Sequence, residues 1–193
     1  MRALHGDAGA ADADAPTQTS ASAARAAASE RFTPESFAGR NDGCLVSRVM
    51  RVYFAGPLFT PYERRFIDEC AARLRAEAIE VFVPHENVLA TAETTAAAVF
   101  AKDLDGVAAA NAVVALLDGP VIDDGTACEI GLFYGLMQGD PSKKGIVGLV
   151  TDLRAERAGD ERGLNLFVLG CIEAAGEVCT SIDDVLAVLS RWS

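Results

Sequence analysis

The chain has 193 residues, a formal net charge of -11 and a sequence pI near 4.6, and half of its residues are hydrophobic. Such an acidic chain is a poor match for nucleic acid or an anionic membrane, because both bind basic surfaces. The length and apolar content fit one domain with a sizeable core plus a tail, and no apolar run approaches the ~18–20 residues of a membrane span.

The cysteines are odd in number and scattered, at Cys44, Cys70, Cys128, Cys171 and Cys179. They form no CxxC pair, and the sequence has only two histidines. A structural zinc site and a disulfide framework are therefore both disfavoured, and we expect reduced thiols in a cytoplasmic protein. The N-terminal sequence has the pattern of neither a secretory signal nor a transit peptide.

Residues 1–46 differ in composition from the rest of the chain. Twelve of the first thirty residues are alanine, mixed with Ser, Thr, Asp and Gly, and they show no periodic apolar face. Such low-complexity composition predicts a disordered tail. We therefore expect one folded domain at 47–193.

From residue 48 onward, segments with strand and helix character alternate. The first half predicts a strand at 48–55, a helix at 60–77, a strand at 79–84, a helix at 92–110 and a strand at 111–119. The second half predicts a turn and helix to about 137, a strand at 144–152, a loop to about 163, a helix at 164–176, a strand at 177–180 and a helix at 181–192. The helix at 60–77 carries Phe66, Cys70 and Leu74 at helical spacing, with Thr60 as its N-cap and Pro61 at its first position.

Apolar strands that alternate with helices indicate a parallel sheet with right-handed crossovers. The predicted fold is a flavodoxin-like or Rossmann-like three-layer α/β sandwich with about five strands. Ligands bind such sheets at the carboxyl ends of the strands, near the switch in strand order. We expect the segments after the first and third strands, 55–59 and 117–125, to meet there.

Several common nucleotide and hydrolase motifs are missing from the sequence. It contains no GxGxxG after the first strand, no GxxxxGK[ST] and no GxSxG. These absences disfavour a dinucleotide dehydrogenase, a P-loop NTPase and a serine hydrolase. A response-regulator receiver is also disfavoured, because no acidic pair follows the first strand.

What remains is a set of acidic residues around the third strand: Asp103, Asp118, Asp123, Asp124 and Glu129. Acids that share a cleft have pKa values that repulsion and burial drive apart, so one can protonate a leaving group while another attacks. This is the logic of retaining glycosyl transfer. A carboxylate in the first turn of a helix is also favoured by the helix dipole, which would keep Glu129 ionised.

Three segments resemble the nucleoside 2-deoxyribosyltransferase family, namely "VYFAGPLF" (52–59), "KDLDGVAAANAVVALLDG" (102–119) and "DDGTACEIGLFYGL" (123–136). The resemblance covers about residues 50–150, and the last motif is the most specific. It implies that Glu129 is the nucleophile that attacks C1' of a 2'-deoxynucleoside. Asp103 would lie beside the nucleophile, and the Tyr53 hydroxyl would bind it.

The same resemblance assigns substrate-binding residues. Asp123 matches the acid that contacts the departing base, although the adjacent Asp124 leaves open which of the two faces the base, and Asp124 could instead cap the helix. Gly56 and Phe59 would wall the base pocket, and Gly125 fits the tight turn into the helix. Asn165 is similar to an asparagine that reaches the sugar 5'-hydroxyl of a neighbouring subunit.

Asp118, which follows the third strand, is a further candidate for substrate binding. Arg64 and Arg65 either contact a 5'-phosphate or form the solvated face of the first helix.

The expected activity is therefore exchange of the base of a 2'-deoxynucleoside with a free nucleobase, without a metal or organic cofactor, in a homo-oligomer. One alternative is an N-glycosidase that releases the base of a 2'-deoxynucleoside or its 5'-monophosphate to water. Another is a non-catalytic nucleotide-sensing or scaffold module.

Overall fold

A computed structural model of the chain describes residues 49–87, 94–152 and 163–193. The predicted tail at 1–46 and most of the predicted loop before residue 163 lie outside the described residues. Each predicted strand and helix has a counterpart in the structure, and the bounds differ by a few residues at most.

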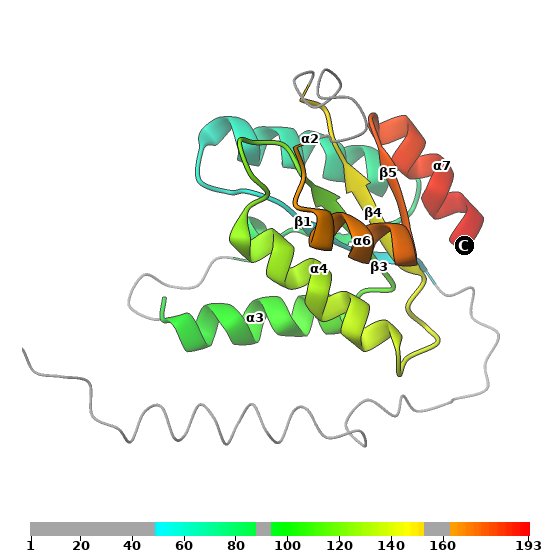
Figure 1. The fold of residues 1–193 in the computed structure, drawn as a ribbon, viewed down its shortest axis with the longest axis horizontal. Coiled ribbons are helices and arrows are strands. Elements are labelled where there is room, and N and C mark those ends of the chain that lie inside the picture. Colours follow the sequence, from blue (N-terminus) through cyan, green and yellow to red (C-terminus); the bar gives the residue numbers. More distant parts are fainter. Residues whose placement is uncertain (1–48, 88–93, 153–162) are drawn as a thin grey trace, which may run out of the picture. The chain divides into compact units, whose positions relative to one another are not determined.

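The centre of the domain is a five-stranded sheet in the order β2-β1-β3-β4-β5, in which every neighbouring pair is parallel (Figure 1). The strands are β1 (Arg51–Ala55), β2 (Glu80–Phe82), β3 (Ala112–Leu116), β4 (Gly145–Leu149) and β5 (Gly176–Cys179). All residues of β3 and β4 are buried, which explains their unbroken apolar sequences. The predicted parallel α/β sheet is confirmed.

The helices are α2 (Pro61–Ala76), α3 (Ala96–Ala109), α4 (Asp124–Met137), α6 (Leu166–Ala175) and α7 (Ile182–Trp192), with a short 3-10 turn η2 (Pro84–Glu86) after β2. Thr60 caps α2 in a reciprocal capping box with Glu63, and Pro61 occupies the first turn, as predicted. Such a cap contributes about 1 kcal/mol to stability.

Helices cover both faces of the sheet. One core cluster joins Val52 and Phe54 of β1 to buried residues of α2 and α7, and the other joins Tyr53 and Ala55 to α3, α4 and α6. In Figure 1, α2 and α7 accordingly lie together along the upper side, while α3, α4 and α6 form a separate group. Alternate residues of β1 therefore face different layers, and Tyr53 faces the layer that contains α4.

Strand order changes direction between β1 and β3. The chain leaves β1 toward the β2 edge and leaves β3 toward the β5 edge, although Ala55 pairs with Ala115 near the ends of these strands. Their carboxyl ends therefore mark the position at which doubly wound sheets bind ligands.

The cysteines that the structure describes, Cys70, Cys128, Cys171 and Cys179, are free thiols. None of the helices in the described ranges combines the length and apolar character that a membrane crossing requires.

Candidate active site

Glu129 and Tyr53 meet at the switch in strand order, although 76 residues separate them in the chain. The Tyr53 hydroxyl donates a hydrogen bond of 2.5 Å to Glu129 Oε1. Tyr53 is fully buried in β1, so its side chain has little freedom to move. The fold thus supplies a fixed donor to one oxygen of the carboxylate.

Aromatic stacking holds the ring of Tyr53 in place. It lies parallel to Phe82 of β2, with ring centroids 5.3 Å apart. Phe82 also lies against Gly106 of α3, where an added Cβ would lie only 2.8 Å from the Phe82 ring. Glycine at 106 therefore leaves room for the Phe82 ring to pack against α3.

Burial dominates the electrostatics of Glu129 and raises its pKa to about 7. The Tyr53 hydrogen bond opposes this rise, the charges of Asp103 and Asp123 add to it, and Lys102 lowers it. Burial and the neighbouring Glu129 raise the pKa of Tyr53 far above its usual value, so the phenol keeps its proton and remains a donor.

The expectation that the helix dipole keeps Glu129 ionised is wrong. Glu129 is the sixth residue of α4, which begins at Asp124, and therefore lies in the second turn. The dipole acts mainly within the first turn. Loss of hydration instead makes Glu129 a weaker acid than usual, with a pKa close to neutral.

Asp103 lies on α3, next to Lys102. Lys102 was not among the site residues predicted from the sequence. Asp103 Oδ1 is buried and accepts no hydrogen bond from the described residues. Lys102 Nζ lies 3.0 Å from this oxygen and donates a 2.8 Å hydrogen bond to the carbonyl of Pro84 in η2. The adjacency of Lys102 and Asp103 in the motif "KDLDG" was the available signal.

The alternative in which Asp124 caps the helix is wrong, because Asp123 is the N-cap of α4. Asp123 Oδ2 accepts hydrogen bonds of 2.8 Å from Thr126 N and 3.0 Å from Thr126 Oγ1. Asp124 is the exposed first residue of the helix. An added Cβ at Gly125 would lie 3.1 Å from Asp123 Oδ2, so glycine keeps the cap clear. Asp123 is half-buried, and its charge acts on Glu129.

Asp118 ties the loop after β3 to the end of β4. Its Oδ1 accepts from the backbone N–H groups of Thr151 at 2.7 Å and Asp152 at 3.0 Å, and its Oδ2 accepts from Thr151 Oγ1 at 2.5 Å. Both oxygens have protein partners, which favours a structural role. Contact between Asp118 and substrate stays a prediction.

The remaining predicted residues lie at the same end of the sheet. An added Cβ at Gly56 would lie 2.9 Å from Ile67 Cδ1 and 3.1 Å from Leu116 Cβ, so a larger residue would have to displace the Ile67 side chain. Phe59 is 78% exposed. Asn165 caps α6 by accepting hydrogen bonds from the N–H groups of residues 167 and 168. Contact of Asn165 with a sugar in a neighbouring subunit stays a prediction.

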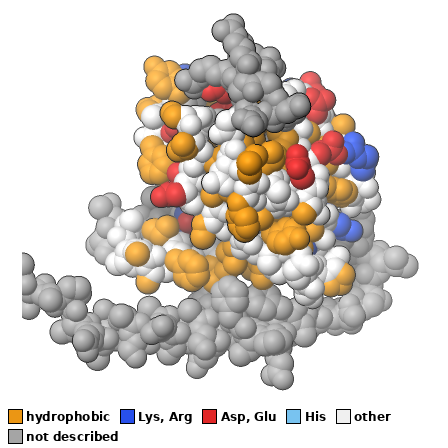
Figure 2. All heavy atoms as spheres, viewed as in Figure 1, with side chains coloured by type: hydrophobic (Ala, Val, Ile, Leu, Met, Phe, Trp, Pro, Cys, Tyr) orange, Lys and Arg blue, Asp and Glu red, His pale blue; other side chains and the backbone are white. Residues whose placement is uncertain are grey.

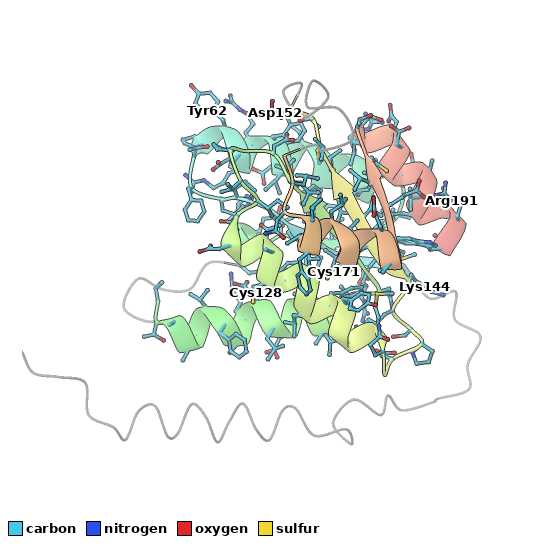
Figure 3. The ribbon with its side chains drawn as sticks, in the orientation of Figure 1. Tyr62, Cys128, Lys144, Asp152, Cys171 and Arg191 are labelled. Atoms are coloured by element: carbon cyan, nitrogen blue, oxygen red, sulfur yellow. The ribbon has the colours of Figure 1, made fainter. Side chains whose placement is uncertain are left out.

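Large exposed apolar side chains occur on the segments that follow the strands. Those that are at least 73% exposed are Phe59, Tyr62, Val121, Leu166 and Phe167. Figure 3 shows Tyr62 at the same end of the molecule as Asp152, and Lys144 at the opposite end. Within residues 49–87, 94–152 and 163–193, no group of three His, Cys, Asp or Glu side chains is arranged to hold a metal ion.

A family model described as nucleoside 2-deoxyribosyltransferase matches residues 52–168, more than half of the chain. The comparison with curated proteins found no match.

Among solved structures, a conserved protein from Enterococcus faecalis V583 is 30% identical, with a TM-score of 0.61, and the match covers 74% of this chain and 98% of that one. A 2-desoxiribosyltransferase from Leishmania mexicana is 21% identical, with a TM-score of 0.55 and coverage of 74% and 97%. A 2-deoxyribosyltransferase from Bacillus psychrosaccharolyticus is 21% identical, with a TM-score of 0.53 and coverage of 70% and 89%. These last two show likeness of fold.

Proposed function

The chain belongs to the nucleoside 2-deoxyribosyltransferase family, whose members are enzymes, and from this premise we propose that it exchanges the nucleobase of 2'-deoxynucleosides through a covalent ester on Glu129. The observation that carries the proposal is the 2.5 Å hydrogen bond from the buried Tyr53 hydroxyl to Glu129 Oε1. A carboxylate held by a fixed donor at the switch in strand order is oriented for attack on an electrophilic carbon.

In the first step, the ionised Glu129 attacks C1' of the deoxynucleoside. Because Tyr53 occupies Oε1, we assign the attack to Oε2. The C1'–N bond breaks, its electron pair passes to the base, and the departing base takes up a proton from solvent that Asp123 helps to deliver. Asp123 Oδ2 holds the helix cap, so its Oδ1 is the oxygen assigned to the base.

In the second step, a nitrogen of a different free base attacks C1' of the deoxyribosyl ester. The C1'–O bond breaks and its electron pair returns to Glu129, while the incoming base gives up its proton to solvent, again with the assistance of Asp123. Two inversions at C1' give net retention. The missing 2'-hydroxyl of the substrate helps both steps, since that electron-withdrawing group would destabilise the positive charge that develops on the sugar.

A homo-oligomer is part of this proposal. Figure 2 shows hydrophobic side chains gathered over the face that α3, α4 and α6 form. Val99 and Phe100 of α3 are 37% and 49% exposed, and Leu166 and Phe167 of α6 are 73% and 83% exposed. An exposed apolar face of this kind is typical of a protein interface. Light scattering of the full chain measures the assembly.

Incubation of the purified full chain with a deoxynucleoside and a different free base tests the activity. Formation of the new deoxynucleoside, detected by chromatography, supports base exchange. Free deoxyribose without exchange would instead identify an N-glycosidase, in which water takes the place of the second base. Release of no base under any condition would leave the non-catalytic module as the better account.

Intact-mass analysis tests the nucleophile separately. Mixing the chain with a deoxynucleoside alone should add the mass of one deoxyribosyl group to the protein. Glu129→Ala should abolish this adduct, while Glu173→Ala, which changes an exposed glutamate of α6, should retain it. An adduct that persists in Glu129→Ala would refute the assignment.

A further inference from the structure

Lys102 is the basic residue among the charged groups that act on Glu129. From β1, Tyr53 donates its hydroxyl proton to the carboxylate, and the loop before α4 contributes the charge of Asp123. The neighbouring helix α3 contributes Asp103 and Lys102, of which only Lys102 favours the ionised form of Glu129. Its side chain is 20% exposed, so water screens its charge only in part.

Two contacts fix the Lys102 ammonium group. It donates to the carbonyl of Pro84 at 2.8 Å and lies 3.0 Å from Asp103 Oδ1. The first contact fastens α3 to the turn after β2, while the second pairs a positive charge with the buried Oδ1 of Asp103. Lys102 thus contacts both the turn after β2 and a carboxylate of the site.

Repulsion between Asp103 and Glu129 explains why the charge of Lys102 matters. Two carboxylates in one cleft resist simultaneous ionisation, and one of them then holds a proton near neutral pH. A cation bound to Asp103 reduces its repulsion of Glu129. The ionised form of Glu129 is then less strongly disfavoured.

We propose that Lys102 is a positioning residue of the reaction, which holds Asp103 beside Glu129 and offsets its charge so that Glu129 is free to act as a nucleophile. The role in catalysis rests on the function proposed above. The electrostatic role does not, and it can be measured without any substrate.

The test is a titration of the Glu129 carboxyl carbon by carbon-13 NMR, with its signal assigned through its loss in Glu129→Gln. The full chain is compared with Lys102→Met, Lys102→Arg and, as a control, Lys144→Met. Lys144 is exposed and lies just before β4, at the end of the sheet opposite the site (Figure 3). Lys102→Met should move the Glu129 midpoint upward by about 0.5 pH unit or more, whereas Lys102→Arg and Lys144→Met should leave it within about 0.2 pH unit.

Base exchange gives the second readout. The acid limb of kcat/KM should move to higher pH in Lys102→Met by the same amount as the NMR midpoint, and Lys102→Arg should restore it. If the Glu129 midpoint is unchanged in Lys102→Met, the proposal is overturned. This holds even if the melting temperature of the variant falls. If Lys102→Met does not fold, Lys102→Gln, which keeps a donor for Pro84, takes its place with the same criterion.

The two readouts separate the possible failures. If no variant exchanges or releases a base, the proposed function fails, while the titration still decides the role of Lys102. If exchange proceeds and the midpoint does not move, the inference on Lys102 fails and the proposed function stands.

Discussion

Replacing Tyr53 with phenylalanine removes one hydroxyl group from the site and leaves the ring that stacks on Phe82. The lost interaction is the 2.5 Å hydrogen bond to Glu129 Oε1. A hydrogen bond to a charged group contributes about 1.5–3 kcal/mol, and one pKa unit corresponds to about 1.4 kcal/mol. The pKa of Glu129, about 7 in the wild type, should therefore rise by roughly 1–2 units in Tyr53→Phe.

This change in pKa gives a rate that depends on pH. At pH 7 the ionised fraction of Glu129 falls from about one half to between about one tenth and one hundredth. Base exchange should therefore slow about 5- to 50-fold at pH 7, and the deficit should shrink as the pH rises toward about 9. At high pH, both proteins approach full ionisation of the nucleophile.

Initial rates of exchange from about pH 5 to about pH 9.5, followed by chromatography, measure the effect. Tyr134→Phe is the matched control, because Tyr134 is a half-buried tyrosine on the same helix as Glu129. Its profile should match that of the wild type. An acid limb in Tyr53→Phe that coincides with the wild-type limb would refute the role given to the hydroxyl.

Three further predictions concern stability, each measured by urea denaturation of the full chain. Because the pKa of Glu129 is higher in the folded chain (about 7) than its ordinary value of 4.5, its contribution to stability is present below about pH 4.5 and is lost as the pH rises through about 7. Glu129→Gln lacks this decline, so its free energy of unfolding at pH 8 should exceed that of the wild type by up to about 3 kcal/mol. If the free energy of unfolding depended equally on pH in both proteins, the raised pKa of Glu129 would be contradicted. Asp123→Ala removes the N-cap of α4 and should lower the free energy of unfolding by about 1 kcal/mol. Asp124→Ala should lower it by less, and equal losses in the two variants would argue against the observed cap. Gly145→Ala would place a Cβ 2.4 Å from a backbone oxygen of α6 and 2.5 Å from the indole of α7, so it should cost at least about 1–3 kcal/mol. Gly131→Ala on α4 meets no atom within 4 Å and should instead stabilise by up to about 1 kcal/mol; a loss there as large as at Gly145 would refute the packing argument.

The alternation of strands and helices was predictable because the local signals agree with the fold. Thr60 and Pro61 begin α2 as expected, and the apolar runs at β3 and β4 are buried strands. The predicted strands were too long, since apolar residues such as Leu117 remain buried beyond the last residue of the strand. Burial shapes the sequence pattern, whereas strand bounds depend on pairing with neighbours.

The site was less accessible to sequence reasoning, because its geometry depends on contacts between distant segments. Asp123 and Asp124 are adjacent residues of the same type, so the sequence does not distinguish them. The direction in which the chain enters α4 makes Asp123 the N-cap. The near-neutral pKa of Glu129 arises from burial under the packed layers. Lys102 gains its importance from the position of Pro84, which lies 18 residues away in sequence.

The contact between Gly106 and the Phe82 ring also ties the charged groups of the site to the hydrophobic core. Gly106 lies one helical turn after Asp103, on the same side of α3, and the Phe82 ring packs against this glycine and stacks on Tyr53. One aromatic ring is therefore in contact both with the helix that bears Asp103 and with the tyrosine that binds Glu129. Repulsion between the acids could move α3 away only by disturbing this packing, so the apolar layer helps to keep the charged groups close together.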